Sequence, residues 1–181
     1  MAYYATLQGG ADMIVLGIDP GYAIVGYGVI SFQGASYQAL GCGAITTDAD
    51  TPFDERLQII FENMNRLIAE VRPDALSIES LYFQNNQKTG IMVAEARGVI
   101  LLSARLAGIP VYEYTPLQVK TAVTGYGKAK KPQVMEMTKR LLKLSKMPRY
   151  DDTADALAVA ICHVHAAGTG VRLQMRNSGI K

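Results

Sequence analysis

Carboxylate side chains occur at three places in the sequence where they could act together. Asp19 and Glu79 each end a short apolar run, and Asp151, Asp152 and Asp155 begin an apolar segment with helical spacing. If the two runs are neighbouring parallel strands, their carboxyl ends place Asp19 and Glu79 side by side. Ligand sites in sheets of this kind lie at that edge.

A group of carboxylates at one sheet edge is typical of a site for hard divalent cations. Mg²⁺ is held in proteins by a few carboxylates together with phosphate oxygens of the substrate. Two such ions about 4 Å apart can activate water and stabilise the leaving oxygen of a phosphodiester. Each acid also has a structural explanation, since residues 19–21 form a turn sequence, Asp151 or Asp152 could cap a helix, and Glu79 could lie at the surface. Taken together, the acids favour a metal-dependent nuclease.

The charge distribution points to a polyanionic partner. The chain has a formal net charge of +2, but residues 120–149 hold nine Lys or Arg against one acid, whereas residues 1–119 hold six against twelve. A basic segment beside an acidic body is typical of nucleic-acid binding, and a solvated surface face is the alternative. A basic helix expected over 132–146 would carry three lysines on one stripe: Lys139, Lys143 and Lys146.

The length and composition favour a single domain. The chain has 181 residues, of which 49% are hydrophobic, so it can bury a core without disulfides or a structural metal. Residues 1–12 have no core pattern and are interpreted as a leader, with Met13 as the natural start. We expect a nuclease domain over 13–167 and a loose tail over 168–181.

Nothing in the sequence predicts secretion or membrane insertion. No apolar run reaches the roughly 18 residues that a membrane span requires, and no signal-peptide pattern opens the chain. Cys42 and Cys162 have neither metal-binding nor redox spacing, which favours buried thiols in a reducing compartment. We therefore expect a cytoplasmic protein without a membrane partner.

The hydrophobic pattern predicts an α/β fold whose mixed sheet is covered by helices on both faces. The first three strands are antiparallel candidates, and later strands alternate with helices. The expected strands are 14–18, 24–32, 36–46, 75–78 and 110–114, and the expected helices are 52–71, 88–107, 132–146 and 151–167.

Two of the expected helices carry more specific predictions. Thr51 is a natural N-cap for the first helix, with Pro52 in its first position. The helix expected over 88–107 is apolar around nearly its whole circumference, which requires cover on both sides. Because Ala94 and Gly98 permit close approach, we expect this helix to pack on the sheet and on a second copy of the chain.

Six short motifs follow one another along the chain. They are Ile18-Asp19-Pro20-Gly21, Gly26-Tyr27-Gly28-Val29-Ile30, Ile78-Glu79, Ala96-Arg97-Gly98, Gln118-Val119-Lys120 and residues 152–158. In this order and spacing they resemble the RuvC family of bacterial Holliday-junction resolvases, from about Met13 to His165. The resemblance implies a ribonuclease-H-like fold with a mixed five-stranded sheet, and a homodimer. It also implies Mg²⁺- or Mn²⁺-dependent cuts placed symmetrically across a four-way DNA junction, which leave 5′-phosphate and 3′-hydroxyl ends.

The same resemblance assigns roles to the acids. Asp19, Glu79, Asp152 and Asp155 match the family's acidic tetrad, which implies two metal ions per active site. Helical geometry alone leaves both Asp151 and Asp152 within about 60° of Asp155 around the axis. The family pattern selects Asp152, where some members have His, and leaves Asp151 as the cap of the last helix.

Four further positions match the family's DNA contacts. Tyr82 and Phe83 follow Glu79 where the family has an aromatic residue that stacks on a base near the crossover, and the sequence leaves open which one inserts. Lys120 and Lys131 match basic residues that face the scissile phosphates. The resemblance also implies the RuvA–RuvB branch-migration complex as a partner.

Two other classes of protein share part of this pattern. Actin-like sugar kinases and ATPases can also begin with an Asp-x-Gly hairpin, but that fold needs a second half with its own phosphate loop. A junction-binding protein without catalysis is expected to lack some of the acids, whereas all four positions are acidic here.

Overall fold

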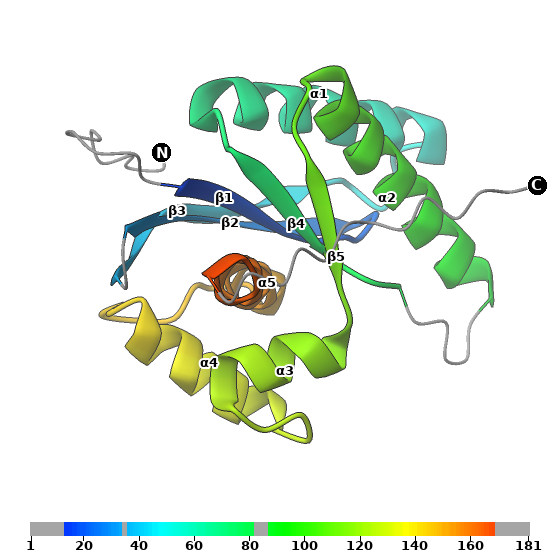
Figure 1. The fold of residues 1–181 in the computed structure, drawn as a ribbon. Helices are drawn as coiled ribbons and strands as arrows, with labels where there is room; N and C mark the ends of the chain where they lie inside the picture. The colour runs from blue at the N-terminus through cyan, green and yellow to red at the C-terminus, as the bar shows by residue number, and fades with distance from the viewer. Residues whose placement is uncertain (1–12, 34–35, 82–86, 169–181) are drawn as a thin grey trace, which may run out of the picture.

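A mixed five-stranded sheet forms the centre of the structure (Figure 1). The computed structural model describes residues 13–33, 36–81 and 87–168. The strand order is β3-β2-β1-β4-β5, with β1 antiparallel to β2 and parallel to β4. The strands are β1 (Met13–Asp19), β2 (Ile24–Gln33), β3 (Ser36–Thr46), β4 (Ala75–Glu79) and β5 (Val111–Tyr114). The predicted fold class is confirmed.

Helices cover both faces of this sheet (Figure 1). Two of them lie on one face, namely α1 (Phe53–Val71) and α2 (Gln87–Leu106). Three lie on the other, namely α3 (Pro116–Thr124), α4 (Lys131–Leu141) and α5 (Asp151–Gly168). None of the helices in the described ranges is long and apolar enough to cross a bilayer.

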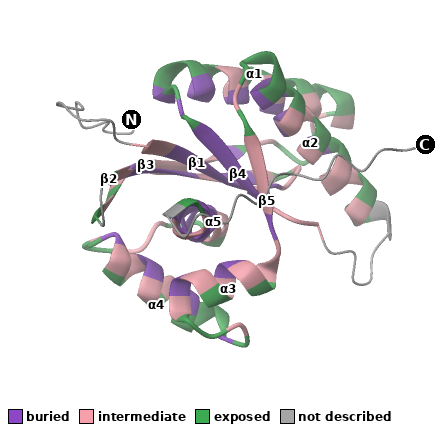
Figure 2. Cartoon of the chain, viewed as in Figure 1, coloured by how far each residue is buried: buried purple, intermediate pink, exposed green. Residues whose placement is uncertain are grey.

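The central strand β1 is buried on both faces, as its apolar sequence predicts (Figure 2). Leu16 and Ile18 belong to the apolar cluster under α1 and α2, whereas Val15 belongs to the cluster under α5. Successive side chains of a strand point to opposite faces, so β1 contributes to both cores.

Helix α5 lies unusually close to β1 and β2. A Cβ atom built on Gly17 would be 2.1 Å from the backbone oxygen of Ala156, and one built on Gly26 would be 2.1 Å from that of Asp152. Only a residue without a side chain permits this approach. The glycines of β1 and β2 therefore fix how deeply α5 sits on the sheet.

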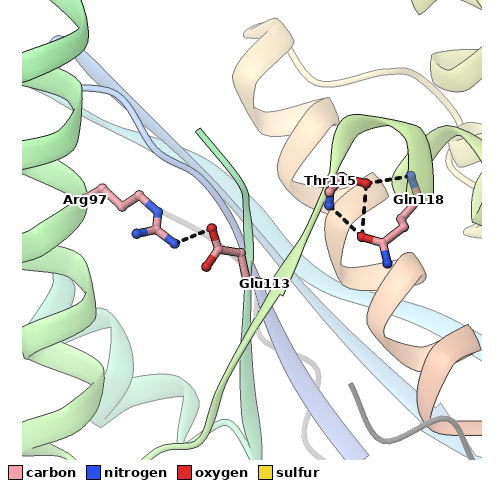
Figure 3. A network of polar contacts seen from close by, with 4 residues as sticks. All are labelled: Arg97, Glu113, Thr115 and Gln118. Atoms are coloured by element: carbon pink, nitrogen blue, oxygen red, sulfur yellow. Dashed lines mark hydrogen bonds and ion pairs between the residues drawn. The ribbon is translucent and has the colours of Figure 1, made fainter. Parts of the chain in front are cut away.

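Helix α3 was not predicted from the sequence, although the sequence contains a signal for the start of a helix. Thr115 accepts a hydrogen bond from the backbone N–H of Gln118 (3.2 Å), and the Gln118 side chain accepts one from the backbone N–H of Thr115 (2.8 Å; Figure 3). Pro116 occupies the first helical position. The segment Thr115-Pro116-Leu117-Gln118 therefore forms a capping box with a proline start.

The first helix begins one residue later than expected. Pro52, not Thr51, occupies the N-cap position of α1, and no side chain caps it. The predicted stop is confirmed, since Arg72 adopts the left-handed conformation and donates its backbone N–H to the Ile68 carbonyl.

The basic helix is shorter in the structure than the expected range 132–146, and the prediction that three lysines share one stripe of it is wrong. Helix α4 ends at Leu141, and Lys143 has a φ of 52°. The backbone N–H of Leu144 reaches the Lys139 carbonyl at 2.9 Å, which closes the helix in a Schellman arrangement. Leu144 packs against the core under α5. Lys143 and Lys146 therefore lie beyond the helix and cannot share a face with Lys139.

Helix α2 has an apolar face that the described residues of this chain leave uncovered. Ile91, Leu102 and Leu106 are 59%, 51% and 68% exposed. A Cβ built on Gly98 meets no atom within 4 Å. The expected contact of this helix with the core is confirmed through Ala96 and Ile100, both fully buried.

Gly17→Ala should destabilise the fold by about 3 kcal/mol or more, because the new methyl group meets backbone atoms of α5 that cannot move separately. Urea unfolding measures the change. Gly43→Ala is a matched control, since its methyl group meets the end of the Tyr27 side chain and should cost about 1 kcal/mol. Equal losses for the two variants would contradict the close approach of α5.

Candidate active site

The carboxyl ends of β1 and β4 bring Asp19 and Glu79 together. The two strands are parallel neighbours with Ile18 paired to Ile78, so the next residue of each strand lies at the same edge. The predicted juxtaposition of these two acids follows from this register. Both side chains line a cleft of about 230 Å³ that also includes Pro20 and Pro116.

Helix α5 adds Asp152 and Asp155 to this edge. The Thr153 hydroxyl, between them, donates to the Gly43 carbonyl of β3 at 3.0 Å and anchors the start of the helix. Gly26, which pairs with Asp19 across the β1–β2 ladder, contacts the backbone of Asp152. The start of α5 therefore lies against the end of β1.

Electrostatics show that three acids surround Asp19, whose pKa is raised from 3.8 to about 7. Burial is the largest cause of this rise, and the charges of Glu79, Asp155 and Asp152 contribute to it in that order, against a lowering by Lys131. Asp151 does not contribute to the shift. Of the two adjacent acids, Asp152 is thus the one that shares the electrostatic environment of Asp19.

The pKa of Glu79 is also raised. Burial is the main cause and the charge of Asp155 adds to it, while Lys120 and Lys131 act in the opposite direction. Glu79 and Asp155 line a second cleft of about 260 Å³ together with both lysines. Two lysine ammonium groups, from α3 and α4, therefore lie on one side of the group of acids.

Lys131 forms the only ion pairs with these acids among the described residues. Its Nζ lies 2.9 Å from Asp155 Oδ2 and 3.3 Å from Asp151 Oδ2. Burial lowers the pKa of Lys131, but the hydrogen bonds and charges of Asp155 and Asp151 outweigh it and raise the value overall. Asp151 is the first residue of α5, and its carboxylate faces Lys131. Because Asp151 lies within the helix and not before it, and its carboxylate pairs with Lys131, the expected capping role is wrong.

A buried arginine holds the loop that follows Asp19. Arg56 of α1 donates through Nε to the Thr47 hydroxyl at 2.8 Å and through Nη2 to the Tyr22 carbonyl at 3.3 Å. Its guanidinium also lies 4.8 Å from the centre of the Tyr22 ring. These contacts fix the β1–β2 loop from the far face of the sheet, and no sequence pattern predicts them.

A second arginine links α2 to the edge strand. Arg97 Nη2 lies 2.8 Å from Glu113 Oε1 on β5 (Figure 3). Two residues beyond Glu113, Thr115 caps α3, which carries Lys120. The ion pair therefore fastens α2 to the strand that leads into the lysine-bearing helix.

The donor chemistry of this edge fits hard divalent cations. Four carboxylates lie together, their charges contribute to the raised pKa values of Asp19 and Glu79, and oxygen is the donor that Mg²⁺ prefers. As they stand, no three acid, histidine or cysteine side chains in the described ranges are arranged to hold an ion. One of the four acids, Asp155, is paired with Lys131 instead.

The two aromatic residues expected to contact DNA, Tyr82 and Phe83, lie outside the described residues. Lys120 and Lys131 are described, and both line the cleft with Glu79 and Asp155. The four acids and the two lysines thus lie close together in space, although they come from five different elements: β1, β4, α3, α4 and α5.

A mixed five-stranded sheet with carboxylates at the ends of β1 and β4 and at the start of the helix packed on it defines a ribonuclease-H-like nuclease fold. Comparison with known proteins makes the assignment specific. The family described as crossover junction endodeoxyribonuclease RuvC matches residues 15–163. The chain belongs to this family of Holliday junction resolvases, which are metal-dependent nucleases.

Individual relatives agree with the assignment. The crossover junction endodeoxyribonuclease RuvC of Alkaliphilus oremlandii is 52% identical over 153 residues, which cover 84% of this chain and 93% of that protein. The structure of Thermus thermophilus RuvC in complex with Holliday junction substrate matches with a TM-score of 0.84 and 36% identity, covering 88% of this chain and 97% of that one. The yeast mitochondrial Holliday junction resolvase shares the fold alone, with a TM-score of 0.64 and 14% identity over 90% of this chain and 80% of that chain.

The metal-free protein should lose stability as the pH rises from about 4 to about 7. The folded state keeps a proton on Asp19 that the unfolded state has released, so unfolding becomes easier across this window, by up to about 4 kcal/mol. Asp19→Asn should remove most of the decline in urea unfolding measured against pH. The control is Glu62→Gln, at an exposed position of α1. If the free energy of unfolding of Asp19→Asn declined with pH as steeply as that of the wild-type protein, the electrostatics described for the site would be contradicted.

Proposed function

We propose that the chain resolves four-way DNA junctions by hydrolysing one phosphodiester in each of two strands, at symmetry-related positions. The products carry 5′-phosphate and 3′-hydroxyl ends. The observation that carries this proposal is the half-buried Asp19 surrounded by Glu79, Asp152 and Asp155, with Lys120 and Lys131 beside them. The related Thermus thermophilus protein is described in complex with a Holliday junction, which supports the same substrate here.

In this proposal Asp19, Glu79, Asp152 and Asp155 hold two Mg²⁺ or Mn²⁺ ions. The bound metal supplies activation of water and charge stabilisation at the leaving oxygen. The carboxylates are pre-positioned by β1, β4 and α5, so little reorganisation of the backbone is needed. The raised pKa values of Asp19 and Glu79 support the assignment, because a divalent cation relieves the repulsion that contributes to them.

The basic and aromatic residues serve the DNA in this proposal. Lys120 and Lys131 contact the scissile phosphate from the side of α3 and α4, where they already oppose the charge of Glu79. Tyr82 or Phe83 stacks on a base at the crossover, an interaction worth roughly 1–3 kcal/mol per base. Both follow Glu79 closely in the sequence, so the stacked base is near the acids.

Two symmetric cuts require two active sites, and we infer a homodimer formed through α2. The apolar face of Ile91, Leu102 and Leu106 is not covered by any described part of this chain, and Gly98 lies where a second backbone could approach. A two-fold dimer presents the same patch from both subunits. It matches the approximate two-fold symmetry of a four-way junction.

The remaining parts of the proposal rest on family membership. We assign the nuclease domain to 13–167, since the family match covers 15–163. Because the substrate is a recombination intermediate, the site of action is the cytoplasm. The RuvA–RuvB branch-migration complex is the proposed partner that delivers the junction.

The acids should serve cutting rather than binding, because a carboxylate repels phosphate unless metal intervenes. Asp19→Asn, Glu79→Gln, Asp152→Asn and Asp155→Asn should each lower Mg²⁺-dependent cleavage of a synthetic mobile junction by at least about 100-fold. Junction affinity without metal should be unchanged or higher. Glu62→Gln should cut normally and serves as the matched loss of a carboxylate. Near-normal cutting by any of the four variants would contradict that residue's role, and cutting of linear duplex at the same rate would contradict junction specificity.

Leu102→Glu should yield monomers, because it places a charge in the apolar face of α2. Light scattering and sedimentation measure the oligomeric state. Leu117→Glu is the matched control, since Leu117 is 60% exposed but lies on α3, and this variant should stay dimeric. A dimeric Leu102→Glu would place the interface elsewhere on the molecule.

A further inference from the structure

The ammonium group of Lys131 lies between two carboxylates with different environments. Asp155 Oδ2 is 2.9 Å away and belongs to the proposed metal site, with 30% of its side chain exposed. Asp151 Oδ2 is 3.3 Å away, its side chain is 64% exposed, and it lies outside the four proposed ligands. Lys131 thus connects an inner carboxylate with one at the solvent side.

This lysine is placed against the local preference of its own helix. Lys130 occupies the N-cap position of α4 and Lys131 its first turn, where the helix dipole disfavours positive charge. The Gln133 side chain accepts from the Lys130 backbone N–H at 2.8 Å and holds this start in place. Asp151 is the first residue of α5, where a negative charge is favoured. The starts of α4 and α5 therefore meet through this ion pair.

We propose that Asp151 is a positioning residue, which keeps the Lys131 ammonium at the rim of the acid group once Asp155 binds a metal. The inference rests on the proposed function. If Asp155 holds a divalent cation, the cation would repel the ammonium and compete with it for the carboxylate, which favours a shift of Lys131 away from Asp155. Asp151 is the second partner that the ammonium already has, and it lies on the outer, more exposed side.

The ion pair with Asp151 determines how the Lys131 ammonium is oriented toward the DNA. Without Asp151, the displaced ammonium has no other ion-pair partner among the described residues, and its flexible stem can adopt many conformations. With Asp151, one orientation is retained beside the cleft where the phosphate enters. The carboxylate itself adds no attraction for DNA, so its contribution is confined to the placement of Lys131.

The test uses Asp151→Asn, Asp151→Glu, Lys131→Met and the double variant Asp151→Asn/Lys131→Met, with Glu62→Gln as the charge control. At saturating junction and Mg²⁺, Asp151→Asn should cut about tenfold more slowly in single-turnover reactions, since a small misplacement is costly to catalysis. Its junction affinity without metal should be unchanged or tighter. Asp151→Glu should restore most of the rate, and the double variant should cut no more slowly than Lys131→Met.

Two measurements do not depend on cutting. Mn²⁺ affinity, measured by calorimetry on the protein alone, should change far less than the cleavage rate in Asp151→Asn. The ¹⁵N signal of the Lys131 ammonium should persist in Mg²⁺ in the wild-type protein and be lost in Asp151→Asn, because the ion pair protects the ammonium from exchange.

Three results would overturn the inference. The first is a wild-type cleavage rate in Asp151→Asn, and the second is that Asp151→Asn lowers the cleavage rate by the same factor in the wild-type and Lys131→Met backgrounds. The third is a loss of Mn²⁺ affinity in Asp151→Asn proportional to its loss of cleavage rate. The last would make Asp151 a metal ligand. Failure of the proposed function has a different signature, since the wild-type protein would then cut without metal or Asp155→Asn would cut normally. In that case the role of Asp151 fails together with the metal site.

Discussion

The contact between α5 and the sheet is the constraint on which the site depends. The backbone of α5 lies so close to β1 and β2 that a single methyl group on Gly17 or Gly26 would overlap it. This depth brings the start of α5 level with the end of β1, and Thr153 fixes it to β3. The acids at the end of β1 and at the start of α5 are therefore held close together by backbone that has little room to move. Contacts made through side chains tolerate small shifts far better than such backbone contacts do.

The same constraint forces like charges together, and the fold offsets this only in part. Asp19 is half-buried beside three carboxylates, so its pKa rises to about 7. Lys131 supplies a compensating charge, but it does so from α4 and reaches only Asp155 and Asp151 directly. In the proposed function, a bound cation offsets the remaining imbalance. The protein thus carries a local cost in stability at the place where its chemistry requires it.

Most of the fold could be predicted from the sequence, because apolar runs and helical spacing are local signals. The position of Asp19 beside Glu79 was predicted on the condition that β1 and β4 are parallel neighbours, and the structure meets that condition. The capping box of α3 was also present in the sequence, and it was missed because residues 115–118 matched no long apolar period. The end of α4 could not be predicted, since Leu144 folds back onto a core that only the tertiary structure forms. Arg56 and the Lys131–Asp151 pair join residues from separate elements, and no local pattern encodes such contacts.

The most direct test of this account is a crystal structure with Mn²⁺, using anomalous scattering to locate the metal. We expect anomalous peaks within bonding distance of the carboxylates of Asp19 and Asp155, with the Lys131 ammonium moved from Asp155 to Asp151. The backbone of α5 should stay in place against Gly17 and Gly26. Peaks at other carboxylates, or a shift of α5 away from the sheet on metal binding, would contradict the claim that this contact builds the site.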